Sequence, residues 1–192
     1  MPSQRVCLIR HGETEWTLNG RHTGTTDIPL TENGRRVARQ WNPVLRRYTF
    51  ELVLTSPMQR ARETCELAGL GDQAEVDCDL KEWNYGEYEG LTPEQIYARR
   101  PTWMIFTDGC PGGESPTQVQ ERLDRVIARV RGVRGNVALF AHGHFLRSFG
   151  ARWLGFRAEE GRLFVLEPAT VSVMGYYRDV PAVLGWNAPF IS

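Results

Sequence analysis

The sequence predicts an α/β protein, a three-layer α/β/α sandwich around a mainly parallel central sheet. Short aliphatic and β-branched runs typical of buried strands alternate with longer segments that have helical periodicity. Such an alternation favours parallel strands joined by helices that cover both faces of a sheet. The chain of 192 residues suits one domain of this kind, so we expect a single domain over residues 1–192.

Composition and charge argue against several classes of protein. Lys+Arg and Asp+Glu number 23 each, whereas a nucleic-acid partner would favour a basic excess. No apolar run approaches the ~18 residues of a membrane span, and the first residues do not resemble a signal peptide. Scattered cysteines without C-x-x-C spacing predict reduced thiols, namely Cys7, Cys65, Cys78 and Cys110. We therefore expect a cytoplasmic protein with neither a nucleic-acid nor a membrane partner.

The first predicted strand, residues 6–9, ends at a charged corner formed by Arg10, His11 and Gly12. Ligands of open α/β sheets bind beyond the carboxyl ends of the strands. A guanidinium can hold an anion there while a neutral imidazole attacks it, and the glycine lets a ligand approach the backbone. This corner predicts a site for an anionic substrate. A loop rich in Gly and Thr is expected over residues 17–29.

A helix and a second strand follow. Thr31 is a good N-cap for a helix, which either ends or kinks before Pro43. The strand over residues 52–55 precedes Ser56, which we expect to cap a helix with proline in its first turn. A helix N-terminus placed there can bind an anion. Arg60 projects from this first turn, although by itself it would be interpreted as an exposed helix residue.

A short strand over residues 75–78 leads into residues 80–90, which are dense in carboxylates and aromatic rings. A carboxyl group walled by Trp83 and Tyr85 would lose solvation, which raises its pKa and suits a general acid. This reasoning does not single out one glutamate. Thr92 is then expected to begin a short helix.

The second half has clearer elements. After an irregular loop over residues 107–114, Ser115 starts a capping box and a helix whose apolar face predicts a scaffold role. That face comprises Val119, Leu123, Val126, Ile127 and Val130. The next strand, residues 137–141, is followed by a helix to residue 154, and strands over residues 171–177 and 182–186 would finish the sheet.

The strand over residues 137–141 ends at His142, Gly143 and His144. Two histidines could suggest a metal site. Residues two apart on a helix point to different sides, however, and no cysteine or carboxylate adjoins them. We therefore expect no metal here.

Three predicted strands thus end in groups suited to phosphate, at residues 10–12, 56–60 and 142–143. Together with the segment around Glu82, their order resembles the histidine phosphatase superfamily, the clan of cofactor-dependent phosphoglycerate mutases and many acid phosphatases. The matching blocks cover nearly the whole chain: residues 8–16, 56–64, 80–86, 112–115 and 141–144.

The resemblance implies roles for individual residues. His11 would become phosphorylated and Glu82 would act as acid and base. Arg10, Arg60 and His142 would hold the phosphoryl oxygens. Further substrate-binding positions that it suggests are Arg21, Thr23, Gly24, Ser56 and Gly143. The chain departs from the pattern at Thr17, where many members of the family have Asn.

Phosphate ester hydrolysis fits these groups. It needs an in-line nucleophile, neutralisation of charge around phosphorus and a proton for the leaving oxygen. Two arginines and a protonated histidine can offset a phosphate dianion, so no metal or other cofactor is implied. A neutral His11 and a protonated Glu82 favour a mildly acidic to neutral optimum.

Two activities of the clan are compatible with this site. Its mutases carry a long insertion between the glutamate and second-histidine blocks that helps to exclude water, whereas only 60 positions separate Glu82 from His142. We therefore expect a metal-independent phosphomonoesterase with a small phosphomonoester substrate and phosphate as product. A phosphoglycerate mutase is the alternative. A non-catalytic protein on this fold would have lost a pocket residue, and all are present.

Several blocks resemble a branch with broad-specificity acid phosphatases and sedoheptulose-bisphosphatase-like enzymes, so sugar phosphates or bisphosphates are expected substrates. A bisphosphate needs a second cationic anchor, for which His22, His144, Arg147 and Arg99 are candidates. The sequence leaves open whether the protein forms a homodimer.

Overall fold

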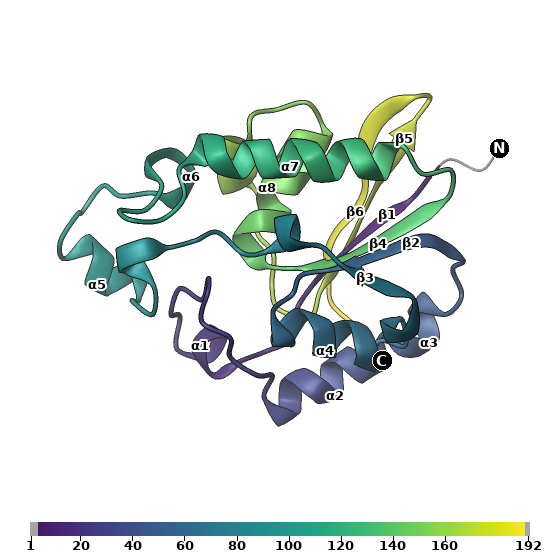
Figure 1. Cartoon of the computed structure of the whole chain (residues 1–192), viewed down its shortest axis with the longest axis horizontal. Coiled ribbons are helices and arrows are strands. Elements are labelled where there is room, and N and C mark those ends of the chain that lie inside the picture. The colour runs from purple at the N-terminus through teal and green to yellow at the C-terminus, as the bar shows by residue number, and fades with distance from the viewer. Residues whose placement is uncertain (1–3, 191–192) are drawn as a thin grey trace.

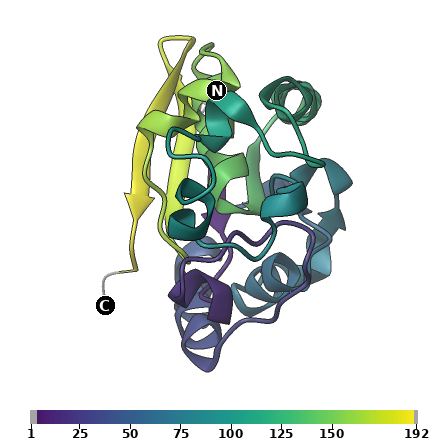
Figure 2. The same ribbon diagram turned by 90° about the vertical axis from the view of Figure 1, so that its left-hand side faces the viewer.

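Four of the six strands of the sheet are parallel to one another. The computed structural model describes residues 4–190, and its six-stranded sheet has the order β3-β2-β4-β1-β5-β6. The β3-β2, β2-β4 and β4-β1 pairs are parallel, whereas β5 and β6 join antiparallel. The predicted mainly parallel sheet is therefore confirmed, with an antiparallel hairpin at one edge (Figure 2). The strands are β1 (Val6–Arg10), β2 (Phe50–Thr55), β3 (Ala74–Val76), β4 (Asn136–Ala141), β5 (Val171–Tyr177) and β6 (Val180–Ala188).

Helices cover both faces of the sheet. In Figure 1, α2 (Glu32–Gln40), α3 (Asn42–Leu45) and α4 (Gln59–Leu67) lie on one side, and α7 (Pro116–Arg131) and α8 (Gly143–Trp153) lie on the other. Three short helices lie together at one end of the molecule, namely α1 (Glu15–Leu18), α5 (Pro93–Tyr97) and α6 (Ile105–Asp108). Single 3₁₀ turns occur at Gly71–Gln73, Cys78–Leu80 and Gly86–Tyr88, and a longer one at Ala158–Leu163.

Alternation along the strands divides the interior into two cores. In β1, Val6 and Leu8 join the core formed with α7 and α8, whereas Cys7 and Ile9 join the core against α3 and α4. Side chains of a strand point alternately to its two faces, and a strand covered on both sides is apolar throughout. This pattern explains why the first predicted strand is a continuous apolar run.

Three predicted helix starts are confirmed and one is wrong. Thr31, Thr92 and Ser115 accept hydrogen bonds as N-caps, and the last two form capping boxes. Ser56 does not cap α4, because the N-cap of this helix is Met58 and its first residue is Gln59. The Ser56 hydroxyl accepts from the Met58 N–H at 3.3 Å, ahead of the helix, and lies 2.8 Å from His142 Nε2.

Other differences concern short elements. The expected loops over residues 17–29 and 107–114 overlap the ends of the four-residue helices α1 and α6, which are too short to show a periodic pattern. The helix after Thr31 ends at Gln40, and α3 follows with proline in its first turn. The predicted apolar face of α7 is fully buried. Within residues 4–190, no helix combines the length and apolar character that crossing a membrane requires.

Candidate active site

The carboxyl ends of β1, β2 and β4 bring distant residues together. His11, Ser56 and His142 each follow directly after one of these neighbouring strands. The His11 N–H donates to the Ala141 carbonyl at 3.0 Å, which continues the β1–β4 ladder into the site. The centroids of the His11 and His142 rings lie 5.1 Å apart at 61°. The two imidazoles therefore lie edge to face within one site.

His11 has the geometry of a nucleophile. Its Nδ1 lies 2.8 Å from the Gly12 carbonyl oxygen, which can only accept, so Nδ1 carries the proton. The Nε2 lone pair is then free to attack. Burial lowers the pKa of His11 well below its ordinary value, and the positive charges of Arg60 and Arg10 lower it further. The imidazole is therefore neutral near neutral pH.

His142 has the opposite tautomer. Its Nδ1 accepts from Arg60 Nε at 3.2 Å, and its Nε2–H donates to Ser56 Oγ at 2.8 Å. Burial, and then the charge of Arg60, lower the pKa of this ring well below its ordinary value. His142 is therefore neutral in the free protein near neutral pH, whereas the protonated histidine expected from the sequence concerns the phosphate complex.

Arg60 is fully buried, not exposed as its helix position alone suggests. Its guanidinium donates to the carbonyls of Thr23, Gly24 and Thr26 at 3.0–3.1 Å. Gly24 lets this loop pack against the Trp83 segment, because a Cβ there would lie 2.6 Å from the Trp83 carbonyl oxygen. The loop thus holds the arginine that lies against His142.

Arg10 retains an unused donor. One of its terminal nitrogens donates to the Leu166 carbonyl, while the buried Nε has no partner among residues 4–190. Gly143 packs directly against this guanidinium, since a Cβ there would lie 3.2 Å from Arg10 Cζ. A buried N–H without a partner is costly, and a phosphoryl oxygen would satisfy it.

Glu82 lies at the start of α8. Its carboxylate accepts from the backbone N–H groups of Trp83 (2.9 Å), His144 (3.0 Å) and Phe145 (2.9 Å). These three donors fix the position of the carboxylate at the N-terminus of α8. The expected aromatic wall is only partly present, because Tyr85 lines the cleft with Glu82 but Trp83 belongs to the core.

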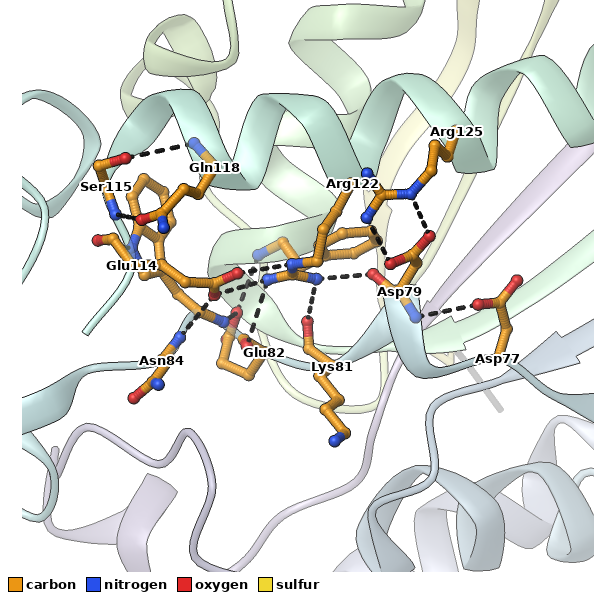
Figure 3. A network of polar contacts seen from close by, with 12 residues as sticks. Asp77, Asp79, Lys81, Glu82, Asn84, Glu114, Ser115, Gln118, Arg122 and Arg125 are labelled. Atoms are coloured by element: carbon orange, nitrogen blue, oxygen red, sulfur yellow. Dashed lines mark hydrogen bonds and ion pairs between the residues drawn. The ribbon is translucent and has the colours of Figure 1, made fainter.

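Arg122 on α7 holds the segment that carries Glu82, a function that the sequence did not indicate. Its guanidinium pairs with both oxygens of Glu114 at 2.7 and 2.8 Å. It also donates to the carbonyls of Asp79 at 2.6 Å and Lys81 at 3.0 Å (Figure 3). Only the position of Arg122 on the polar side of an amphipathic helix, eight residues after Glu114, hints at this pairing.

A cleft of about 400 Å³ opens onto these groups. The predicted residues that line it are Arg10, His11, Arg21, His22, Thr23, Glu82, Gly143, His144 and Arg147. Ser56, Arg60 and His142 are fully buried and do not line it, nor does Gly24. Arg99 is exposed and lies outside the cleft. The aromatic lining, not assigned from the sequence, comprises Trp16, Tyr97, Trp103 and Phe106.

The positively charged residues of the cleft differ in part from the cationic anchors predicted from the sequence. Burial lowers the pKa of both His22 and His144, so neither is a cationic anchor at neutral pH. Arg147 lies over the Phe106 ring at 4.6 Å, and Arg162 also lines the cleft.

At the unusual Thr17, the hydroxyl is used within α1, where it donates to the Thr14 carbonyl and accepts from the Thr14 N–H, both at 2.8 Å.

Comparison with known proteins agrees with this geometry. The family model of the histidine phosphatase superfamily (branch 1) matches residues 6–189. An acid phosphatase of Mycobacterium tuberculosis is 40% identical, over 95% of this chain and 93% of that protein. Sedoheptulose 1,7-bisphosphatase of Saccharomyces cerevisiae is 37% identical, over 83% of this chain and 72% of the yeast protein. The solved structure of an open reading frame product of M. tuberculosis superimposes with a TM-score of 0.92 and 37% identity, covering 97% and 98% of the two chains.

Proposed function

The chain belongs to the histidine phosphatase superfamily, and from this premise we propose that it is a metal-independent phosphomonoesterase that acts through a phosphohistidine on His11. Its substrates are small phosphorylated metabolites, sugar phosphates or bisphosphates. The names of the acid phosphatase and bisphosphatase relatives support this class. The observation that carries the proposal is the 5.1 Å approach of His11 to His142, with His11 Nε2 free and both arginines beside the pair.

In the first step, His11 Nε2 attacks phosphorus in line with the leaving oxygen. The N–P bond forms, the P–O bond to the alcohol breaks, and Glu82 gives its proton to that oxygen. Glu82 must therefore enter this step as the protonated acid. Arg10, Arg60 and His142 neutralise the phosphoryl oxygens. Charge-assisted hydrogen bonds of this kind contribute roughly 1.5–3 kcal/mol each.

The second step returns the enzyme to its first state. Glu82, now a carboxylate, takes a proton from water. The water oxygen attacks phosphorus, the P–N bond breaks and inorganic phosphate leaves. His11 regains its neutral Nε2, and the proton on Glu82 serves the next turnover. General acid–base catalysis of this kind contributes about 10²–10⁴ in rate.

Replacement of the nucleophile tests this proposal. His11→Asn should abolish hydrolysis of p-nitrophenyl phosphate, whereas the wild type should keep full activity in excess EDTA. Equal melting temperatures of the two proteins would exclude misfolding as the cause. Full activity of a folded His11→Asn variant would contradict the proposal, and loss of wild-type activity in EDTA would contradict its metal independence.

A second assay separates the phosphatase from the mutase. With 3-phosphoglycerate and a bisphosphoglycerate primer, the phosphatase releases inorganic phosphate faster than 2-phosphoglycerate appears. The opposite order would assign the mutase activity. The open cleft, which leaves water access to His11, supports the phosphatase.

We also propose a cytoplasmic location. All the cysteines are free thiols, and Cys7, Cys65 and Cys110 are buried. Burial raises the pKa of the Cys7 thiol to about 11 and that of Cys65 to about 12, so neither forms a reactive thiolate. Such thiols suit a reducing compartment, and cell fractionation tests the assignment.

A further inference from the structure

Two imidazole rings in the wall of the cleft have no part in the mechanism above. The His22 and His144 rings are parallel to within 4°, with centroids 6.0 Å apart. Tyr85 lies edge-on to both, and Trp103 and Phe106 each hold one ring from another side. Rings packed in this way cannot turn freely, so they present fixed hydrogen-bonding atoms to a ligand.

The hydrogen bonds fix the tautomer of each ring. His22 Nδ1 lies 3.0 Å from the Leu91 carbonyl oxygen, which only accepts, so Nδ1 carries the proton and Nε2 is an acceptor. Tyr85 Oη lies 2.6 Å from His144 Nδ1. This short distance is typical of an O–H donor, so the phenol donates and His144 Nε2 carries the proton.

The pair therefore offers one acceptor and one donor. Both residues line the cleft and are half-buried. Within residues 4–190, neither Nε2 has a hydrogen-bond partner, and both remain accessible to solvent. Each Nε2 is thus left for a ligand. Burial keeps both rings neutral by lowering their pKa.

The position of the pair identifies the part of the substrate that it meets. The backbone N–H of His144 donates to Glu82 Oε2 at 3.0 Å, and Glu82 protonates the leaving oxygen in the proposed mechanism. The alcohol that departs therefore lies on the side of the cleft where His144 and His22 stand.

We propose that His22 and His144 form a binding site for two hydroxyl groups of the leaving alcohol, which makes the enzyme selective for phosphates of polyhydroxylated alcohols. One hydroxyl donates to His22 Nε2, and the other accepts from His144 Nε2–H. This inference rests on the proposed phosphatase function and names residues that select its substrate.

A second phosphate group fits the pair poorly. Phosphate oxygens of a dianion only accept, so the lone pair on His22 Nε2 would repel them. A hydroxyl both donates and accepts, which matches the two different nitrogens. Arg147 and Arg162 also line the cleft and carry the positive charge that a second phosphate needs, so a bisphosphate would bind them and not the neutral histidine pair.

The test compares glycerol 1-phosphate with propyl phosphate, which lacks the two hydroxyls. In the wild type, kcat/KM should be higher for glycerol 1-phosphate, the diol, than for propyl phosphate. The ratio of the two values should fall about tenfold or more in His22→Phe and in His144→Phe, because a site built to bind hydroxyls discriminates strongly against a substrate that lacks them. Met104→Leu, an apolar change in the same cleft, should keep the wild-type ratio. Because the readout is a ratio between two substrates, a general loss of activity does not imitate it.

Other outcomes contradict the inference. If the ratio of kcat/KM for glycerol 1-phosphate to that for propyl phosphate is unchanged in both phenylalanine variants, the inference is overturned. It is also overturned if the variants lose a preference for propane-1,3-diyl bisphosphate over propyl phosphate instead of the preference for the diol. If His144→Phe does not fold, Tyr85→Phe replaces it, because loss of the phenol frees the tautomer of His144 and should also lower the ratio. If the wild type does not hydrolyse p-nitrophenyl phosphate, the proposed function itself has failed.

Discussion

At the scale of single residues, the reactivity of His11 is set by its surroundings. The Gly12 carbonyl fixes its tautomer, and burial with Arg60 and Arg10 lowers its pKa well below 6.5. A base with a lowered pKa stays unprotonated to a lower pH. The nucleophile therefore persists in mildly acidic solution, where an ordinary histidine is charged.

This pKa predicts the acid limb of the pH profile. For the wild type, kcat/KM corrected for ionisation of the substrate should not decline between pH 7.5 and 6.5, and should fall only well below pH 6.5. The profile of kcat/KM reports ionisations of the free enzyme. An acid limb at or above 6.5 that does not belong to the substrate would contradict the account of His11.

Glu82 should be needed in proportion to the basicity of the leaving group. Glu82→Gln keeps a side chain of the same shape but cannot give a proton. Alcohol release in the first turnover should fall about 10²–10⁴-fold with an alkyl phosphate. In rapid-quench measurements, the Glu82→Gln variant should still show the first-turnover burst of p-nitrophenolate, because this leaving group needs little protonation. Equal losses with both substrates would remove Glu82 as the acid.

At the scale of elements, α7 does more than cover the sheet. Arg122 joins this helix to the backbone on the N-terminal side of Glu82, and Glu114 accepts from the Asn84 N–H on the other side at 2.9 Å. One bidentate pair thus positions the carboxylate from both directions (Figure 3).

Arg122→Lys tests this positioning. Lysine keeps the charge but cannot reproduce the bidentate geometry, so first-turnover release from an alkyl phosphate should fall about tenfold or more, with a smaller effect on p-nitrophenyl phosphate. The matched control is Arg125→Lys on the same helix. Arg125 also makes a bidentate pair, at 2.7 and 2.8 Å, but only with the side chain of Asp79. If Arg122→Lys and Arg125→Lys slow both substrates equally, Arg122 does not position Glu82 and only stabilises the fold.

Elements were predictable where local chemistry decides them. The capping boxes at Thr92 and Ser115 and the buried face of α7 depend on neighbours in sequence, and they are present. Ser56 was assigned wrongly because α4 begins three residues later, at Gln59, and the Ser56 hydroxyl contacts His142, 86 positions away. The resemblance supplied Arg60, whose burial no local pattern indicates. The neutrality of His22 and His144 and the reach of Arg122 depend on tertiary packing and were not predictable.

At the scale of the whole molecule, every histidine lies in or beside one site, with His11 and His142 buried and His22 and His144 half-buried. The pKa of each of the four is lowered by burial, at His11, His22, His142 and His144. Their unfolded-state pKa is about 6.5, so below that pH the unfolded chain binds protons that the folded protein does not. Stability is therefore lost as pH falls, and the site that performs the chemistry limits the fold in acid.

Urea unfolding measures this linkage. The free energy of unfolding should be nearly flat from pH 8 to 7 and decline between pH 6.5 and 5, where each histidine adds up to about 1.4 kcal/mol per pH unit. A double variant, His22→Phe with His144→Phe, should show a shallower decline than the wild type. An equal slope in both proteins would show that these two rings are not neutral in the folded state.

The central claim is that His11 carries the phosphoryl group, and direct trapping tests it. Wild-type enzyme mixed with p-nitrophenyl phosphate and quenched within the first turnover should yield, by mass spectrometry, a phosphate that is labile to acid and stable to base on the peptide containing His11. A turning-over enzyme whose peptide at His11 is never phosphorylated, or whose phosphate resides on another residue, would contradict the account.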